Sequence, residues 1–423
     1  MGKPDVSMSR ILLFGDQAGT GFGTVTRDLG TALIAQGEDV RFVSINEDDE
    51  PPTAEIGERT FMVGAANGYL AVPDDVDEAT AFLARLDGLI SGPTWDTHPL
   101  GPWRPDAVIV LGDFYAVRRM PEMFPSVRTV PTFHYVPIEG VDIPPSWAEF
   151  WSVVHPVAMS RFGAGEIKRA TGIYAPTIYH GVDTSAFWPV SAARPIRLGD
   201  AVLRSREECK AYFGGRPEST WLFRADRHMP RKRYASLLRS IAPVLAAHRD
   251  TWFLYHCRTH DQGGNLADTL SKYPPAIRSR CLSTRFHDQY GGAPREMLNA
   301  LYNAADVYVT VSAEGFGLTI AEALACGVPV VGMDYSSVPE VVGPAGLLAP
   351  VAYLVDNEYD HAWAAVDERA FGKLVDRLVV NIAERRVLGA KGPLHVTTNF
   401  RWDTAARQFA DLIGAAIRSE VAA

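Results

Sequence analysis

Short apolar runs alternate with helical patterns along almost the whole chain, and this alternation limits the fold more than any other feature. Such runs, separated by helices, are typical of parallel sheets built from strand–helix–strand units. The sequence therefore predicts an α/β protein with doubly wound sheets. Strands are expected at 10–14, 39–45, 107–111, 127–133 and 153–159, and again at 220–224, 251–256, 280–283, 306–311 and 328–332.

The alternation stops and restarts in the middle of the chain. Residues 187–209 are rich in Arg, Ser and Pro and show no clear periodicity, which predicts a linker. Two doubly wound domains would follow, with ligands expected in a cleft at the carboxyl ends of their strands. Apolar residues at helical spacing predict further helices at 24–36 and 402–418. Residues 349–369 break the rhythm and are interpreted as a loop or a local elaboration.

The segment from Ser312 to Val331 places two glutamates, Glu314 and Glu322, eight positions apart around a glycine turn. A strand precedes this turn and a helix is predicted to begin at it, so backbone N–H groups are free to face a phosphate. Carboxylates do not bind phosphate, so they indicate a ligand with hydroxyl groups on both sides of its phosphates. A nucleotide-sugar has that form. The alternative is that Glu314 only stabilises the helix, as an acid near the positive end of its dipole, and that Glu322 faces solvent.

A basic segment follows the first strand of the second series. Four arginines and one lysine lie within residues 224–233, among them Arg227 and Lys232. Breaking a sugar–phosphate bond leaves about one more negative charge on the diphosphate, which fixed cations stabilise more in the transition state than in the ground state. The alternative is a solvated basic surface, or a patch for an anionic polymer.

Two features of the first series are weaker indicators. His134 is predicted to end a strand and to contact a sugar, although a lone histidine is often structural. Gly21 and Gly23 belong to a glycine-rich turn that lets a ligand approach the backbone. Its G-x-G-x-G spacing departs from the G-x-G-x-x-G of dinucleotide sites. A substrate contact and a plain structural turn both stay open.

The composition is that of an ordinary soluble globular protein. The net charge of −9 argues against a general nucleic-acid binder but leaves a local basic cleft open. The four cysteines form no Cys-x-x-Cys pair, and the acidic runs at 47–50 and 74–77 lie in polar stretches, so no metal site is predicted. No signal-like start and no apolar run near the ~20 residues of a membrane span occur, which predicts a cytoplasmic protein.

Taken together, these motifs resemble glycosyltransferase family 4, retaining enzymes of the GT-B fold. The stretch from Glu314 to Glu322 resembles the family's Glu-x7-Glu motif, and Arg227 and Lys232 match its diphosphate-binding pair. Residues 179–183, Tyr-His-Gly-Val-Asp, resemble the segment before its interdomain linker. The resemblance implies an N-terminal acceptor-side domain at 1–190, joined by a returning C-terminal helix at 402–423, and a donor domain at 191–401. Residues 349–369 replace a short loop of that family.

The resemblance also implies a role for each matching residue. Glu314, Arg227, Lys232 and His134 would be catalytic, with Glu314 holding donor-sugar hydroxyls and His134 near the sugar's hydroxymethyl group. Glu322 would bind ribose. Backbone groups of Phe316, Gly317, Leu318 and Thr319 would meet the sugar and phosphates, and Gly21 and Gly23 would face the diphosphate and the acceptor.

The expected activity is transfer of a hexose from a nucleotide-diphosphate sugar to a hydroxyl acceptor, without metal or other cofactor. The donor is expected to be a UDP-sugar, on its frequency in the family alone. The acceptor stays open. Candidate acceptors include macromolecules, namely a protein, a lipid-linked sugar and, as the least favoured, modified DNA. A non-catalytic sugar-nucleotide binding protein is the alternative of a different class.

Overall fold

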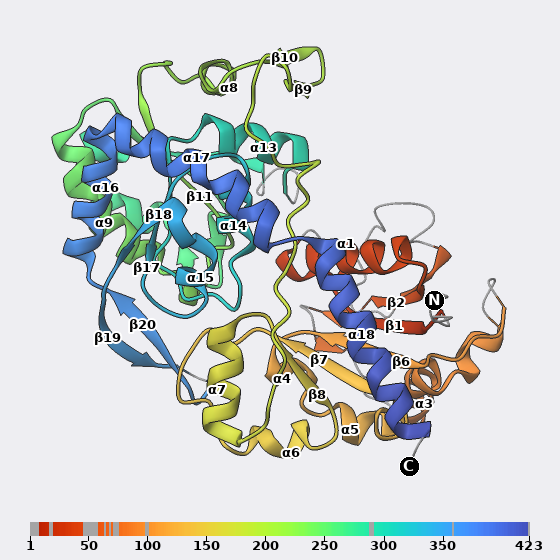
Figure 1. Ribbon diagram of the computed structural model, residues 1–423. Coiled ribbons are helices and arrows are strands. Elements are labelled where there is room, and N and C mark those ends of the chain that lie inside the picture. The colour runs from red at the N-terminus through yellow and green to blue at the C-terminus, as the bar shows by residue number, and fades with distance from the viewer. Residues whose placement is uncertain are drawn as a thin grey trace. The chain divides into compact units, whose positions relative to one another are not determined.

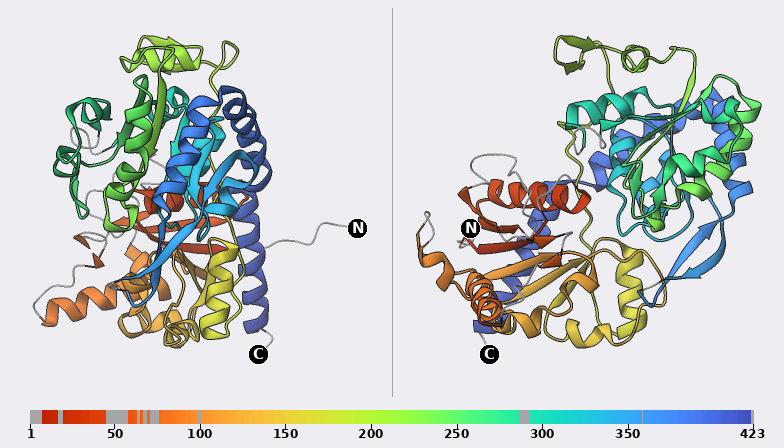
Figure 2. Two further views of the ribbon diagram at one scale, coloured as in Figure 1. Left: turned by 90° about the vertical axis from the view of Figure 1, so that its left-hand side faces the viewer. Right: turned by 180° about the vertical axis from the view of Figure 1, so that it is seen from behind.

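The computed structural model describes residues 8–16, 20–44, 58–62, 65–66, 69–70, 76–97, 101–286, 292–357 and 359–421. The chain divides into two compact units, labelled by their elements in Figure 1 and seen from two further sides in Figure 2. Unit 1 contains Met1–Ile138, Asp142–Gly181 and Trp402–Ala423, and unit 2 contains Glu139–Val141 and Val182–Arg401. The chain thus enters unit 2 at 182, not at 191. Residues 139–141 belong to unit 2, although their sequence neighbours belong to unit 1.

Each unit contains a six-stranded sheet, and both sheets have the same strand order. The order is β3-β2-β1-β6-β7-β8 in unit 1 and β15-β12-β11-β16-β17-β18 in unit 2. All neighbouring strands within both sheets are parallel. This is the 3-2-1-4-5-6 order of the Rossmann sheet. The predicted α/β class with two Rossmann-like sheets is confirmed.

The elements of unit 1 alternate between strand and helix. Its sheet strands are β1 Arg10–Gly15, β2 Asp39–Ser44, β3 Thr60–Met62, β6 Ala107–Leu111, β7 Thr132–Val136 and β8 His155–Ala158, with a small pair β4 Ala65–Ala66 and β5 Tyr69–Leu70. Its helices are α1 Gly21–Ala35, α3 Val76–Ser91, α4 Phe114–Val117, α5 Met120–Met123, α6 Trp147–Trp151, α7 Arg161–Thr171 and α18 Trp402–Val421, with 3-10 turns η1 Pro93–Thr97 and η2 Pro125–Arg128.

Unit 2 repeats this plan and adds three antiparallel hairpins. Its sheet strands are β11 Thr220–Ala225, β12 Thr251–His256, β15 Cys281–Ser283, β16 Val307–Val309, β17 Val330–Met333 and β18 Gly346–Ala349. The hairpins are β9 Ile196–Leu198 with β10 Ala201–Leu203, β13 His260–Asp261 with β14 Gly264–Asn265, and β19 Val351–Asp356 with β20 Ala362–Val366. The helices are α8 Arg206–Tyr212, α9 Tyr234–Ala247, α10 Leu266–Ser271, α11 Pro275–Arg278, α13 Arg295–Ala304, α14 Leu318–Ala325, α15 Val338–Val342, α16 Glu368–Val380 and α17 Ile382–Asn399, with 3-10 turns η3 Pro230–Lys232 and η4 Gly343–Ala345.

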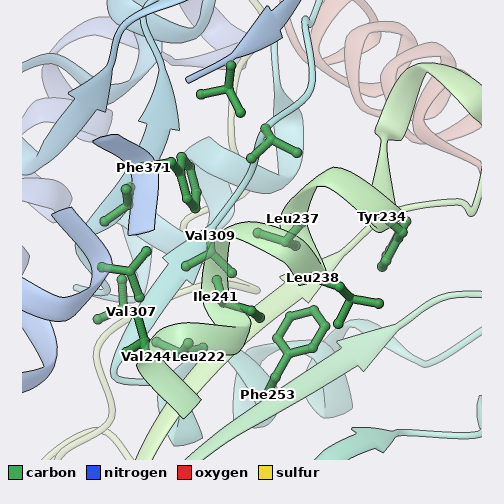
Figure 3. Close-up of a cluster of buried hydrophobic side chains, with 14 of the residues drawn as sticks. Leu222, Tyr234, Leu237, Leu238, Ile241, Val244, Phe253, Val307, Val309 and Phe371 are labelled. Carbon is green, nitrogen blue, oxygen red and sulfur yellow. The ribbon is translucent and has the colours of Figure 1, made fainter. Parts of the chain in front are cut away.

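The core of unit 2 lies between its sheet and the helices that cover it. Figure 3 shows Leu222 and Val309 of the sheet among Leu237 and Ile241 of α9, with Phe371 of α16 close by. All of these side chains are buried. Burying such a side chain contributes about 1.5–3 kcal/mol to the stability of the fold. The cluster therefore holds the strands of unit 2 in place, together with the loops that follow their ends.

The C-terminal helix α18 belongs to unit 1 and packs on α1. Phe409 meets Tyr135 of β7 edge to face, with ring centroids 5.0 Å apart. The side chain of Gln36 donates a hydrogen bond of 2.6 Å to the backbone oxygen of Asp403. The predicted C-terminal helix that returns to the first domain is confirmed. Among the described helices, none is both long enough and apolar enough to cross a bilayer.

Three sequence predictions require correction. The strand expected at 127–133 starts late: residues 125–128 form η2, and β7 begins at Thr132 after Pro131, whose nitrogen has no proton for a ladder hydrogen bond. The expected linker is not featureless, because it contains the β9–β10 hairpin and α8, which is capped by the Ser205 hydroxyl. For residues 349–369 the interpretation as a loop is wrong and the local elaboration holds, because they contain an antiparallel hairpin, β19–β20, with a shift of register between Val351 and Tyr353.

Candidate functional site

The candidate site of unit 2 is built where β11 and β16 end, since parallel strands present their carboxyl ends at one edge of the sheet. The turn after β16 leads to α14, whose N-cap Gly317 has a φ of +102°. A side chain is strained in this conformation, and a Cβ here would lie 2.9 Å from Ile320 Cδ1. Glycine at 317 therefore allows the chain to turn directly from the loop into the helix.

Glu314 is buried and held at both carboxylate oxygens. Lys232 Nζ lies 2.5 Å from Oε1, Ser312 donates a 2.6 Å hydrogen bond to the same oxygen, and Arg231 Nη1 lies 3.2 Å from Oε2. Burial works to raise the pKa of Glu314, but the charges of Lys232 and Arg231 and hydrogen bonds from Lys232 and Ser312 outweigh it and lower the pKa to about 2. The carboxylate is therefore ionised at neutral pH and can only accept hydrogen bonds.

The backbone of Glu314 is fixed as firmly as its side chain. Its N–H donates to Ser336 Oγ at 2.9 Å, and the hydroxyl of Ser337 donates to its carbonyl oxygen at 2.7 Å. Both serines precede α15, so the turn of Glu314 is tied to the loop after β17. A ligand that meets this carboxylate meets a group with a set position.

Lys232 ends the 3-10 turn η3 and contacts two acids. Besides Glu314, its ammonium group lies 3.8 Å from Asp226 Oδ2. Asp226 in turn accepts hydrogen bonds of 2.8–3.1 Å from the fully buried Arg224. The guanidinium group of Arg224 lies over the Tyr234 ring, 4.5 Å from its centroid. Positive and negative side chains thus alternate from the core of unit 2 to Glu314.

Arg227 stands apart from this row. It pairs with Asp261 of the β13–β14 hairpin through hydrogen bonds of 3.0 and 2.8 Å, and 44% of its side chain is exposed. The two cations named from the sequence are therefore in different settings. Lys232 is buried against Glu314, and Arg227 is accessible and held by a hairpin.

Glu322 is buried within α14 rather than facing solvent. Its Oε2 accepts a hydrogen bond of 2.7 Å from the Tyr302 hydroxyl of α13. The alternative of a solvent-facing Glu322 is therefore wrong, because the helix turns this residue inward against α13. Its role toward ribose stays a prediction.

The start of α14 contains the four residues whose backbone groups are predicted to meet the sugar and phosphates, and that role stays a prediction. Phe316 is buried and packs edge to face against Phe400, with centroids 5.3 Å apart. Leu318 and Thr319 are half-buried and lie in the first turn, where an α-helix has no carbonyl partner for its N–H groups. The Thr319 hydroxyl accepts a 2.8 Å hydrogen bond from Tyr308.

His134 lies in the middle of β7 and is fully buried, which corrects the expectation that it ends its strand. Trp151 Nε1 donates to His134 Nδ1 at 3.2 Å, so Nε2 carries the proton and donates to the Gly112 oxygen at 2.9 Å. Burial lowers the pKa of His134 to about 4, against the effect of the Gly112 hydrogen bond. This is the setting of a structural histidine, and contact with a sugar stays a prediction.

Gly21 and Gly23 form the first turn of α1 rather than a free loop. Thr20 caps the helix, because its hydroxyl accepts from the Gly23 N–H at 3.0 Å and donates to Asp16 at 2.6 Å. A Cβ at Gly21 would meet no atom within 4 Å. Residues 17–19 of the same turn lie outside the described part of the chain.

The sequence reasoning missed two residues of this site. Arg231 belongs to the basic segment but was not singled out, although its position next to Lys232 was a usable signal. Glu139 lies 3.2 Å from Arg231 Nε. No local pattern marked it, since its partner is distant in sequence.

Among the described residues, no group of three or more His, Cys, Asp or Glu side chains is arranged to hold a metal ion. Metal independence stays a prediction.

Comparison with known families places this geometry in context. Residues 220–365, which include the site of unit 2 except Glu139, match the family model described as glycosyl transferases group 1. The O-antigen chain mannosyltransferase B of Escherichia coli is 44% identical over 84 residues, which are 18% of this chain and 22% of that protein. The GDP-mannose-dependent alpha-(1-6)-phosphatidylinositol monomannoside mannosyltransferase of Mycobacterium tuberculosis (strain CDC 1551 / Oshkosh) is 28% identical over 265 residues, 60% of this chain and 58% of that protein. The chain thus spans less than two thirds of either relative.

Solved structures share the fold across the whole chain. A glycosyltransferase from Rickettsia africae ESF-5 covers 96% of this chain and is covered over 98% of its own, with a TM-score of 0.68 and 14% identity. The Anabaena protein HepE, in complex with UDP and glucose, covers 96% of this chain and is covered over 100% of its own, with a TM-score of 0.69 and 12% identity. At these identities the likeness establishes the architecture alone.

Proposed function

We propose that this chain, which has the GT-B fold and carries a glycosyl transferases group 1 segment at residues 220–365, is a retaining glycosyltransferase that uses a nucleotide-diphosphate sugar. The observation that carries the proposal is the buried pair of Lys232 and Glu314 beside the start of α14. A cation next to a helix start suits a diphosphate. A carboxylate held in its ionised form suits sugar hydroxyls. Both groups lie inside the matched segment.

For this reaction the protein has mainly to position the substrates and to stabilise the negative charge on the leaving group. Transfer breaks the bond between the anomeric carbon and the diphosphate oxygen and forms a bond from that carbon to the acceptor oxygen. The acceptor proton passes to the leaving phosphate oxygen on the same face, so no protein nucleophile is needed. Lys232, Arg227 and the N–H groups of Leu318 and Thr319 would stabilise the charge that develops on the leaving group.

Glu314 and Glu322 would flank the diphosphate in this proposal. Glu314 would accept hydrogen bonds from the donor sugar and so orient its anomeric carbon. Glu322 would accept from a ribose hydroxyl in place of, or together with, the Tyr302 hydroxyl that it now meets. No metal or further cofactor is part of the proposal, because the two cations supply the positive charge.

The donor nucleotide is a finer question. The expectation of a UDP-sugar rested on frequency alone. The Mycobacterium tuberculosis relative is named for GDP-mannose, and so are relatives in Corynebacterium glutamicum and Mycolicibacterium smegmatis. We therefore propose GDP-mannose as the first donor to test, with UDP-glucose as its rival.

The acceptor is proposed as a hydroxyl of a sugar or an inositol. The relatives' names point to such acceptors, among them D-inositol 3-phosphate in the Streptomyces griseus relative, which is 30% identical over 250 residues. A protein, a lipid-linked sugar and modified DNA stay as alternatives. A duplex acceptor predicts binding that weakens steeply with salt.

A thermal-shift panel with GDP-mannose, UDP-glucose, GDP and UDP tests the proposal. The true donor at 100 times its dissociation constant stabilises the fold by about 2.7 kcal/mol. Donor hydrolysis or transfer, followed by analysis of the anomeric configuration, then tests the enzyme and its retaining route. Stabilisation without any turnover would favour a non-catalytic binding protein. No shift with any sugar nucleotide, in that panel or a wider one, would overturn the proposal.

A further inference from the structure

Residues 139–141 contact the β19–β20 hairpin through one isolated antiparallel bridge. Val141 and Ala362 exchange two backbone hydrogen bonds, of 3.0 and 2.8 Å, as in an antiparallel bridge. The Tyr335 hydroxyl accepts from the Val141 N–H at 3.1 Å and donates to the Ala362 oxygen at 2.9 Å. Figures 1 and 2 show the hairpin as a ribbon that extends away from the sheet of unit 2. The hairpin therefore gives this segment a fixed backbone partner.

Gly140 is the residue that permits this close approach. A Cβ at this position would lie 2.5 Å from the Ala362 carbonyl oxygen and 2.5 Å from His361 Cδ2. One of these atoms belongs to backbone, which cannot move aside as a flexible side chain does. A larger residue here would push the segment off the hairpin.

The segment brings Glu139 to the candidate site. Glu139 Oε1 lies 3.2 Å from Arg231 Nε, and only 14% of its side chain is exposed. Arg231 uses Nη1 to reach Glu314 Oε2 at 3.2 Å and the Ala313 oxygen at 2.7 Å. The planar guanidinium group of Arg231 thus contacts Glu139 through Nε and Glu314 through Nη1.

We propose that Glu139 is a positioning residue for Glu314, that it acts through Arg231, and that the β19–β20 hairpin serves to hold it in place. The inference rests on the proposed function, in which Glu314 orients the donor sugar. It gives a role to the elaboration at 349–369. Glu139 itself touches no reacting atom.

The physical reason is the order of charges. Glu139, Arg231, Glu314 and Lys232 alternate in sign, and each contacts the next. Without the Glu139 charge, Arg231 loses one of the groups that orient its guanidinium group, and its contact with Oε2 of Glu314 is held less firmly. A misplaced sugar then slows transfer, because small displacements of a reacting group cost up to about a hundredfold in rate. Binding of the nucleoside diphosphate, which lacks the sugar, does not depend on Glu314 in this way.

The test compares Glu139→Gln with Glu149→Gln, which changes an exposed acid of α6 in unit 1. With the donor identified by the panel above, we expect kcat to fall about ten- to a hundredfold in Glu139→Gln. Affinity for the free nucleoside diphosphate, measured by calorimetry, is expected to stay within about twofold. Equal kcat in Glu139→Gln and the wild type would overturn the inference while leaving the proposed function intact. If diphosphate affinity and thermal stability fell together with kcat, the inference would also be overturned, since such a result indicates a general structural role.

A double-mutant cycle tests the route through Arg231. In an Arg231→Gln background, Glu139→Gln should cause no further loss of kcat. Losses that multiply would show that Glu139 acts independently of Arg231 and would overturn this route. A wild-type chain that binds no sugar nucleotide overturns the proposed function and the inference with it.

Gly140→Ala tests the hairpin contact with Glu139 unchanged. It should lower kcat as Glu139→Gln does, again with little effect on diphosphate affinity. Gly165→Ala in α7 is the matched control, since a Cβ there would meet no atom within 4 Å. Normal kcat in Gly140→Ala would contradict the role given to the hairpin.

Discussion

Lys232 Nζ lies 2.5 Å from Oε1 of Glu314, and the two side chains are only 12% and 11% exposed. A hydrogen bond between two charged groups is about twice as strong as a neutral one. Removing one partner of a buried pair leaves the other charge uncompensated, which costs more than the pair contributes as a whole. The pairing of charges around Glu314 therefore decides how a substitution acts on both stability and turnover.

Lys232→Ala should lower both. We expect turnover to fall by a factor of ~100 or more, because the leaving diphosphate loses a buried cation. The free energy of unfolding should fall by less than the ~3–5 kcal/mol of a fully uncompensated buried charge, because Glu314 loses its nearest cation but keeps Arg231. Steady-state kinetics and chemical denaturation measure the two effects. Near-normal transfer by this variant would contradict the assignment of the donor site.

Arg227→Ala should lower turnover without a comparable loss of stability. Its ion pair with Asp261 is partly exposed, and such pairs contribute about 0–1 kcal/mol. Turnover is nevertheless expected to fall by a factor of ~100 or more, since in the proposed site Arg227 faces the diphosphate and stabilises its developing charge. Arg249→Ala, at an exposed arginine after α9, is the control for simple loss of positive charge. Similar kinetics for the two variants would remove Arg227 from the site.

Glu322→Ala should weaken binding of the free nucleoside diphosphate, because in the proposed site a ribose hydroxyl loses its acceptor. The expected loss is about tenfold or more, typical of a hydrogen bond to a charged group. Tyr302→Phe is the companion variant, because it removes the hydroxyl that Glu322 now meets and keeps the carboxylate. Calorimetry with the nucleoside diphosphate measures both. Unchanged affinity in Glu322→Ala would end the ribose role.

Glu314 should also make the free energy of unfolding depend on pH in the acid range. Its pKa is lowered to about 2 in the folded chain, from an ordinary value of 4.5. A carboxyl group with a depressed pKa stabilises the fold above its unfolded pKa, and this contribution is lost as pH falls through the folded value. The loss amounts to about 3 kcal/mol between these two pKa values. Denaturation of wild type and Glu314→Gln across that window should show a shallower decline in the variant. Parallel declines would contradict the pairing.

The parts of the fold that the sequence predicted best are the buried strands. The strands at 107–111 and 251–256 were predicted with the bounds that the structure has, because apolar residues fill the first strand and the interior of the second. The strand before His134 was placed too early, since its apolar residues extend across Pro131. That one shift changes His134 from a residue at a strand end into one buried in the middle of β7.

The missed parts of the site depend on contacts between distant residues. Glu314 and Lys232 were visible as members of local motifs, and the structure then joined them. Glu139 had no motif, and its place depends on a hairpin whose residues follow more than two hundred positions later. Hydrophobic periodicity reports which face of an element is buried. It carries no information about which side chain from another segment will meet that face.

Helix α18 has a consequence for the order in which the protein is made. It follows all of unit 2 in the sequence, yet it packs on α1, which precedes unit 2. Domains fold largely in the order in which the ribosome releases them. Nearly all of unit 2 is therefore synthesised while unit 1 still exposes the surface that α18 will cover. During translation, unit 1 is begun before unit 2 and completed after it.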